Sequence, residues 1–119
     1  MRLRTALPAL ALLAALPACS VLGKKDGGSP PETLQVRNAS GETLFYVYAR
    51  PSGTSEWGSD LLAGDSYTMS DGETGTVRLP RSRSCLYDFR GTNLRAEKQA
   101  VVSDVNVCRA PTVVIPAMR

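Results

Sequence analysis

The chain has 119 residues, with 14 Lys and Arg, 11 Asp and Glu and a formal net charge of +3, which leaves room for one small domain. It contains no histidine, and this removes the commonest general base, the usual Ser-His and Cys-His nucleophile pairs and the commonest transition-metal ligand. Of the 14 basic residues, Arg2 and Arg4 belong to the first 18 residues, so 12 basic residues stand against 11 acidic ones in the rest. This near-neutral balance disfavours nucleic acid as a partner, and we expect no catalytic residue, no cofactor and no metal.

The first 18 residues have the pattern of a secretory signal peptide. Two arginines precede an apolar run of mainly Ala and Leu over residues 5–16, and this run is shorter than the roughly 20 apolar residues that span a bilayer. The sequence Leu16-Pro17-Ala18-Cys19 then resembles the lipobox of bacterial lipoproteins. The resemblance implies cleavage before Cys19, a diacylglycerol on the Cys19 sulfur and a further acyl chain, such as palmitate, on its amino group. Several acyl chains anchor firmly where one would not, so a lipid bilayer is the first expected partner.

An ordinary signal peptide that leaves Cys19 as a free thiol is the alternative. We favour lipidation, because an exposed unpaired thiol is a liability in an oxidising compartment. Ser20 follows, where an acidic residue would indicate retention at the inner membrane, and it resembles the default that sends bacterial lipoproteins to the outer membrane. We therefore expect a lipid-anchored protein of the bacterial cell envelope, held at the outer membrane and facing the periplasm.

Residues 19–32 are small, polar and rich in Gly and Pro, which is typical of a flexible tether. Within it, Lys24 and Lys25 either contact anionic lipid head groups or belong to a solvated linker, which is the interpretation we favour. The folded domain is predicted to occupy residues 33–119.

From residue 33 onward, short apolar runs with a period of two lie between turn residues, which is the pattern of β-strands. The segment 43–50 is apolar on both faces, so we place it at the centre of a sheet. Turns are expected at 38–42 and 91–93. The predicted strands are residues 33–37, 43–50, 74–80, 85–90, 95–103, 104–108 and 112–115.

Seven short strands predict an all-β fold, a small antiparallel sandwich that is immunoglobulin-like in architecture. Cys85 and Cys108 are expected to form its one disulfide, because an exported chain matures in an oxidising compartment; two reduced, buried cysteines are the alternative. An immunoglobulin domain has a tryptophan between its two cysteines, whereas Trp57 precedes both. The likeness is therefore limited to the architecture.

Residues 51–65 form the longest segment without a strand pattern, and Trp57, the single tryptophan, lies in its middle. A loop of this length is either functional or packed against the domain. We favour a packed loop in which Trp57, Leu61 and Leu62 cap one end of the sandwich. The alternative is a partner-binding loop with Trp57 as its anchor.

Arg81 and Arg83 flank Ser82 and are the other candidates for partner binding. A cluster of arginines binds phosphate or carboxylate groups. Because the chain is nearly neutral, pairing with carboxylates across strands is the interpretation we favour. The arginines expected near this pair are Arg78, Arg90, Arg95 and Arg109.

Four carboxylates lie close enough in the sequence to suggest a calcium site: Asp60, Asp65, Asp71 and Glu73. Their spacing is not that of an EF-hand, and Asp71-Gly72 is typical of a turn, so we expect solvated turn carboxylates. The enzyme hypothesis requires a carboxylate pair acting on a glycan, Glu56 with Asp60. We expect both side chains to face water instead.

The stretches YVYARPSGTSEWGSDLL, TVRLP, CLYDFR and VNVC are similar to a group of small exported bacterial proteins without an assigned activity. The similarity covers most of residues 34–115. It implies a disulfide-linked β domain and supplies no catalytic residue. We therefore expect a non-enzymatic binding or structural module whose partner is an envelope protein or peptidoglycan. Inhibition of a cell-wall hydrolase such as lysozyme is the alternative, disfavoured because the chain lacks the acidic excess that suits a basic target.

Intact-mass spectrometry of the mature protein tests the lipid anchor. We expect a chain that begins at Cys19 and carries a diacylglycerol and one further acyl chain. The variant Cys19→Ser is expected to move the protein from the membrane pellet to the soluble fraction, whereas the neighbouring control Ser20→Ala stays in the pellet. An unmodified thiol on the mature wild-type chain would contradict the lipid anchor.

Overall fold

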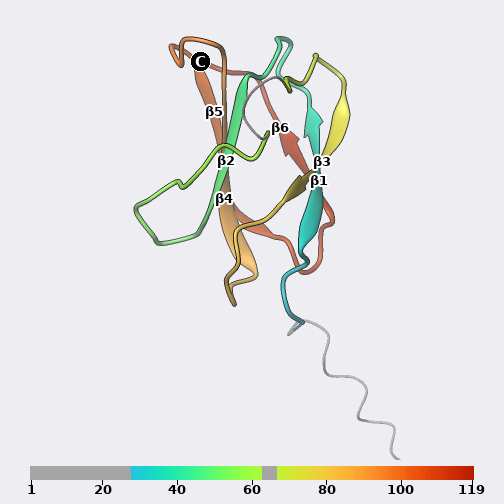
Figure 1. The fold of residues 1–119 in the computed structure, drawn as a ribbon, viewed down its shortest axis with the longest axis vertical. Helices are drawn as coiled ribbons and strands as arrows, with labels where there is room; N and C mark the ends of the chain where they lie inside the picture. The colour runs from blue at the N-terminus through green and yellow to red at the C-terminus, as the bar shows by residue number, and fades with distance from the viewer. Residues whose placement is uncertain (1–27, 63–66) are drawn as a thin grey trace, which may run out of the picture.

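The structure, a computed structural model, describes residues 28–62 and 67–119. The predicted signal peptide, Cys19, the Lys24-Lys25 pair and Asp65 lie outside the described residues. Six strands form two three-stranded sheets that face each other (Figure 1). They are β1 (Thr33–Asn38), β2 (Tyr46–Pro51), β3 (Thr74–Arg78), β4 (Leu86–Thr92), β5 (Gln99–Asn106) and β6 (Thr112–Ile115).

The two sheets have the strand orders β3-β1-β6 and β2-β4-β5. Paired neighbours are antiparallel except β1 and β6, which run parallel. The predicted all-β fold is confirmed, because the described residues contain no helix. Accordingly, the described part of the chain offers no helix that is long and apolar enough to cross a membrane.

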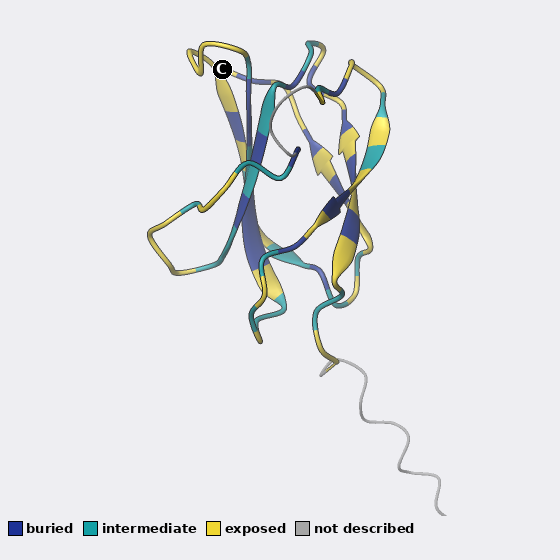
Figure 2. Ribbon diagram, viewed as in Figure 1, coloured by how far each residue is buried: buried dark blue, intermediate teal, exposed yellow. Residues whose placement is uncertain are grey.

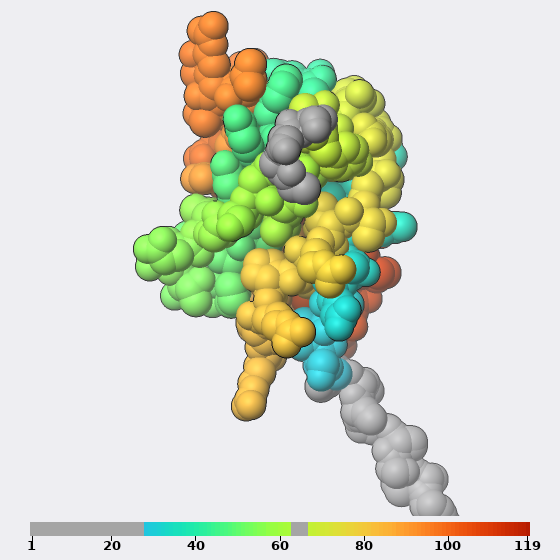
Figure 3. Space-filling view, in the orientation of Figure 1, coloured from blue at the N-terminus to red at the C-terminus, as the bar shows by residue number. Residues whose placement is uncertain are grey.

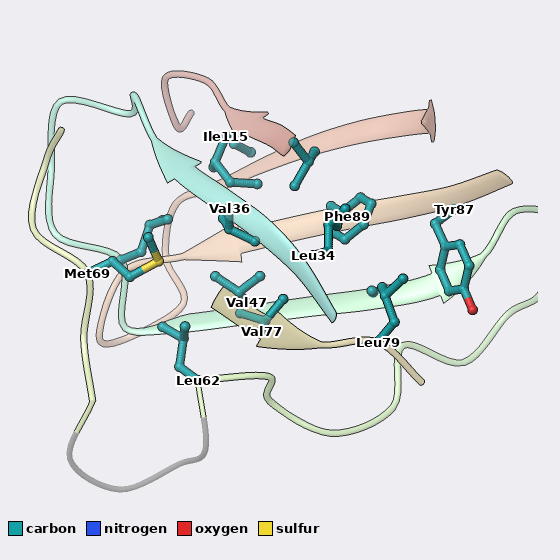
Figure 4. Close-up of a cluster of buried hydrophobic side chains, with 14 of the residues drawn as sticks. Leu34, Val36, Val47, Leu62, Met69, Val77, Leu79, Tyr87, Phe89 and Ile115 are labelled. Atoms are coloured by element: carbon teal, nitrogen blue, oxygen red, sulfur yellow. The ribbon is translucent and has the colours of Figure 1, made fainter. Parts of the chain in front are cut away.

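Side chains from the facing sides of the two sheets form one hydrophobic core (Figure 4). Exposed and buried residues alternate along β1, so Leu34 and Val36 point inward, and Figure 2 shows this alternation as bands of colour along the strand. Fully burying one such side chain contributes about 1.5–3 kcal/mol. The apolar side chains buried most completely are Tyr87, Phe89, Leu44, Leu62, Met69, Ile115, Val36 and Val47.

Gly91 permits the close approach of the two sheets at the far end of β4. A Cβ atom on this residue would lie 2.9 Å from Leu44 Cδ2 and 3.0 Å from Ile115 Cγ2, which is shorter than the optimal carbon–carbon separation.

The predicted turn at 91–93 is wrong, because residues 91 and 92 belong to β4. The strand continues to Thr92, and the turn begins at Asn93, whose Oδ1 accepts backbone N–H groups of Glu97 at 2.9 Å and Lys98 at 3.3 Å.

The described residues of the domain form six strands rather than the predicted seven, because the segments 95–103 and 104–108 contribute to one strand, β5. In the β4–β5 register, Tyr87 faces Val105 while Phe89 faces Val102, so two residues of β5 oppose Asp88. This is a β-bulge, and Asp104 within it has a positive φ of 56°. Because of the extra residue, the period-two pattern of inward-facing side chains shifts by one position within β5. In the sequence, this shift looks like the end of one strand and the start of another.

The segment 43–50 was predicted to lie at the centre of a sheet, but β2 is an edge strand and β4 is central. Its apolar character on both sides has a different cause, since Val47 and Ala49 enter the core while Tyr46 and Tyr48 stack on the outer surface. The edge of β2 is protected near Val47. There the Leu61 N–H donates to Val47 O at 2.7 Å, and Asp60 Oδ1 accepts the Val47 N–H at 3.0 Å.

The predicted disulfide between Cys85 and Cys108 is confirmed, with Cα atoms 5.3 Å apart. It joins the residue before β4 to a residue shortly after β5, so it closes one end of a single sheet. The inter-sheet bridge of an immunoglobulin domain connects different sheets, and this disulfide differs from it. Gly28 O lies 3.3 Å from Cys85 Sγ and 3.4 Å from Cys108 Sγ, which places the start of the described chain at the same end.

Removing the disulfide tests its contribution to stability. The bond closes a loop with a sequence separation of 23, and the chain-entropy estimate for such a loop is about 3.4 kcal/mol. We therefore expect the double variant Cys85→Ser/Cys108→Ser to lose about this free energy of unfolding in urea titrations followed by circular dichroism. A loss below about 1 kcal/mol would contradict this account of the bridge.

Candidate functional site

The outer surface of the β2-β4-β5 sheet carries a cluster of aromatic and guanidinium side chains, which we call the Trp57 face. It consists of Tyr46, Tyr48 and Arg50 of β2, Arg90 of β4 and Trp57 from the loop after β2. The period of two places alternate residues of β2 on this surface. Arg90 joins them because it pairs with Tyr48 in the β2–β4 register.

The indole of Trp57 stacks on both arginines of the face. The guanidinium carbon lies 4.0 Å from the indole centroid in Arg50 and 5.1 Å in Arg90, and the Arg90 carbon lies 4.8 Å from the Tyr48 ring. The Tyr46 and Tyr48 rings are stacked with centroids 6.3 Å apart. A cation–π contact of this kind contributes about 0.5–1 kcal/mol at exposed sites, so these contacts hold Trp57 against the sheet while part of its surface stays accessible.

A buried carboxylate, Asp88, fixes the position of Arg50 beneath the indole. Asp88 is 6% exposed; its Oδ2 accepts Arg50 Nε–H at 3.1 Å, and its Oδ1 accepts the Ser52 hydroxyl at 2.7 Å and the Asp104 N–H at 3.0 Å. Burial by itself would raise the pKa of this carboxyl. The hydrogen bonds and the Arg50 charge outweigh burial, so the pKa of Asp88 lies below its ordinary value of 3.8.

Two polar atoms on the same side of β4 have no hydrogen-bond partner among the described residues. They are Arg90 Nε and Thr92 Oγ1, both buried, and Thr92 as a whole is 3% exposed. Arg90 also forms no ion pair with a carboxylate of the described chain. A buried polar group without a hydrogen-bond partner costs free energy, so these two atoms are unsatisfied positions on the outer side of β4.

The loop that carries Trp57 divides between the two sides of the sheet. Leu62 is buried in the core and Leu61 packs against it, which are the contacts that the capping interpretation requires of these two residues. Trp57 lies on the outer surface instead of over an end of the sandwich. Figure 1 shows this loop projecting sideways from the lower part of β2.

The described carboxylates that were candidates for a calcium site, Asp60, Asp71 and Glu73, accept hydrogen bonds from backbone N–H groups. Asp60 Oδ1 accepts N–H groups of Val47 and Leu62, and Asp71 Oδ1 accepts the Gly41 N–H. Glu73 accepts the Ser70 N–H and the Tyr67 hydroxyl, and burial together with this carboxylate raises the pKa of Tyr67. Within residues 28–62 and 67–119, no group of three or more such ligands could hold a metal ion.

Arg81 and Arg83 lie away from Trp57, at the end of the sandwich where β1 begins. With Arg78 they line a groove of ≈ 500 Å³ whose other wall includes Pro30, Pro31 and Glu32. Of the arginines expected to pair with carboxylates, Arg78 reaches Glu32 at 4.0 Å with both side chains exposed. The ion pair across strands at 3.1 Å is formed instead by Arg50 with Asp88, an arginine for which no pairing was predicted. Neither Arg81 nor Arg83 forms an ion pair with a described carboxylate.

Sequence reasoning considered Trp57 and Arg90 but did not connect them, and it missed Tyr48, Arg50 and Asp88 as their partners. The alternation of Tyr46, Tyr48 and Arg50 in YVYAR was the available signal for one outer surface. The register with β4 could not be read from it.

No family model matches the chain, and no curated protein and no solved structure matches it either.

The charge of Asp88 is expected to stabilise the fold at neutral pH. Asp88→Asn replaces a charge-assisted acceptor by an amide, and we expect a loss of about 2 kcal/mol in the free energy of unfolding at pH 7. Because the folded-state pKa is lowered, the contribution is present above the unfolded pKa and is lost as the pH falls through the folded pKa. The difference between wild type and variant should therefore shrink below pH 3.8.

Urea titrations from neutral to acid pH measure this difference, with Asp104→Asn as the control, because Asp104 is exposed and contributes its backbone N–H. A difference that is independent of pH would mean that Asp88 acts through shape alone.

Proposed function

We propose that this protein is a lipoprotein, anchored at the outer membrane through acylated Cys19, whose β domain is a non-enzymatic binding module of the cell envelope. The Trp57 face is the observation that carries this proposal. Trp, Tyr and Arg are the residue types that dominate binding energy in protein recognition sites, and all three gather here on one sheet surface.

Peptidoglycan is the partner that suits this face best. Its sugar rings present flat C–H surfaces to aromatic side chains, and its peptide stems carry carboxylates, which guanidinium groups recognise. Arg90 contributes a positive charge that no described carboxylate neutralises. The partly exposed rings of Tyr46, Tyr48 and Trp57 supply the stacking surface.

The non-enzymatic part of the proposal is supported by the position of Asp60. Its Oδ1 accepts two backbone N–H groups, at 3.0 Å from Val47 and 3.1 Å from Leu62, so this oxygen serves the fold. Its proposed partner Glu56 is exposed. A glycan-hydrolysing pair needs two carboxyl groups that face the same scissile bond.

For the architecture, we propose that the immunoglobulin likeness is confined to the layering of two β sheets. In that fold a tryptophan lies between the two cysteines and the disulfide joins the two sheets. Here Trp57 precedes both cysteines, and the Cys85–Cys108 disulfide closes one end of a single sheet. The likeness therefore carries no inference about the partner.

Co-sedimentation with purified peptidoglycan tests the function. The mature chain with Cys19→Ser, which lacks the anchor, is expected to sediment with the polymer, and Trp57→Ala is expected to weaken binding by about tenfold or more, as for a hot-spot residue. Leu94→Ala is the matched control, because Leu94 is 57% exposed and lies outside the face. Arg90→Lys should also weaken binding, since an ammonium group lacks the planar fork of arginine.

Equal sedimentation of the Cys19→Ser chain with and without Trp57→Ala or Arg90→Lys would contradict the assignment of this face. If the Cys19→Ser chain itself does not sediment with peptidoglycan, the wall-polymer partner is wrong. A pull-down from detergent-solubilised envelope that depends on Trp57 would then identify a protein partner in its place.

A further inference from the structure

The ends of the sandwich differ in charge. β1 begins where the described chain enters the domain, and the register places Arg78 opposite Thr33 at this end, which we call the tether end. The far end, where β1 finishes, has as many acidic as basic side chains. The tether end has Arg78, Arg81, Arg83 and Arg109 with Glu32, besides the Arg50–Asp88 pair and Asp104 near the ends of their strands, whereas the far end has Arg37, Arg95, Lys98 and Arg119 with Glu42, Asp71, Glu73 and Glu97.

The arginines of the tether end are presented by an ordered loop. The hydroxyl of Tyr87, a fully buried residue, bonds to Pro80 O at 2.8 Å and to Ser82 Oγ at 2.9 Å. Ser82 Oγ also accepts the Ser84 N–H at 2.9 Å. Arg81 and Arg83 are therefore held on either side of an anchored residue, and both side chains are exposed.

The N-terminal segment completes this end of the molecule. Leu79 N–H donates to Glu32 O at 2.9 Å, and Pro30 and Pro31 form a wall of the arginine-lined groove. Figure 3 shows the first described residues, in blue, beside the segment that precedes β4. The groove volume of ≈ 500 Å³ is within the range of small-molecule sites.

The length of chain between the anchor and this end restricts its distance from the membrane. Cys19 and Gly28 are separated by nine peptide steps in the sequence, and a fully extended chain of this length spans at most about 31 Å. A domain anchored through Cys19 thus has its tether end within reach of the bilayer surface. The contact becomes intramolecular, so even weak affinity is sufficient for it.

We propose that the tether end binds anionic phospholipid headgroups of the membrane that holds the chain, through Arg81 and Arg83 and the groove that they line. The proposal rests on the proposed lipid anchor, and its chemistry is the pairing of guanidinium groups with headgroup phosphates. With this end on the bilayer the strands point away from the membrane. The Trp57 face, which lies on the side of the β2-β4-β5 sheet, then remains open to a partner in the periplasm.

Vesicle co-sedimentation of the mature chain with Cys19→Ser tests the contact separately from lipidation. We expect binding to vesicles that contain phosphatidylglycerol, weaker binding as salt rises, and little binding to phosphatidylcholine alone. An arginine near an anionic surface contributes about fivefold in partition, so Arg81→Gln/Arg83→Gln should reduce binding by about 25-fold. The matched control is Arg37→Gln/Arg95→Gln, which removes the same charge from the far end and should bind as wild type.

Three results would overturn the proposal: equal binding to both vesicle types, equal loss in the far-end control, or loss with Lys24→Gln/Lys25→Gln but not with Arg81→Gln/Arg83→Gln. The last result would assign the contact to the tether lysines. Circular dichroism of each variant verifies that it is folded. A failed vesicle experiment leaves the acylation of Cys19 and the peptidoglycan experiment with Trp57→Ala unaffected, so the two proposals fail separately.

Discussion

The outer side of the β2-β4-β5 sheet is organised by one buried charge. A carboxylate that is 6% exposed must be compensated by hydrogen bonds or it would take up a proton. Asp88 obtains its bonds from Arg50, from Ser52 and from the backbone of Asp104. The first fixes a guanidinium on the sheet surface, the second begins the Trp57 loop, and the third requires the bulge in β5. The Trp57 face is built on these three contacts.

The two surfaces proposed for binding lie on different parts of the domain. Aromatic rings and two guanidinium groups occupy a side of one sheet, where stacking and carboxylate recognition are both possible. Arg81 and Arg83 occupy the tether end, where few carboxylates oppose them. Under the proposed anchoring, one surface serves the membrane and the other serves the space beyond it.

Stability comes from a modest core, a disulfide and polar groups that close the ends. Asn38 is fully buried and donates to Glu42 O and Met69 O at 2.7 and 2.9 Å, which seals the turn after β1. The disulfide and the Tyr87 hydroxyl perform the equivalent task at the tether end. Such end closures matter in a domain this small, because its core alone supplies only a narrow margin of stability.

The sequence by itself determined the all-β class, most strand positions and the Cys85–Cys108 bridge, because period-two patterning and cysteine pairing are local or nearly local signals. The tertiary structure alone decided that β2 is an edge strand, that residues 99–106 form one bulged strand, and that Gly91 belongs to a strand rather than a turn. It also decided that Trp57 meets Arg50 and Arg90 while Arg81 and Arg83 lie at another end. Strand order and register depend on which distant segments pair, and a one-residue shift moves every side chain to the opposite face.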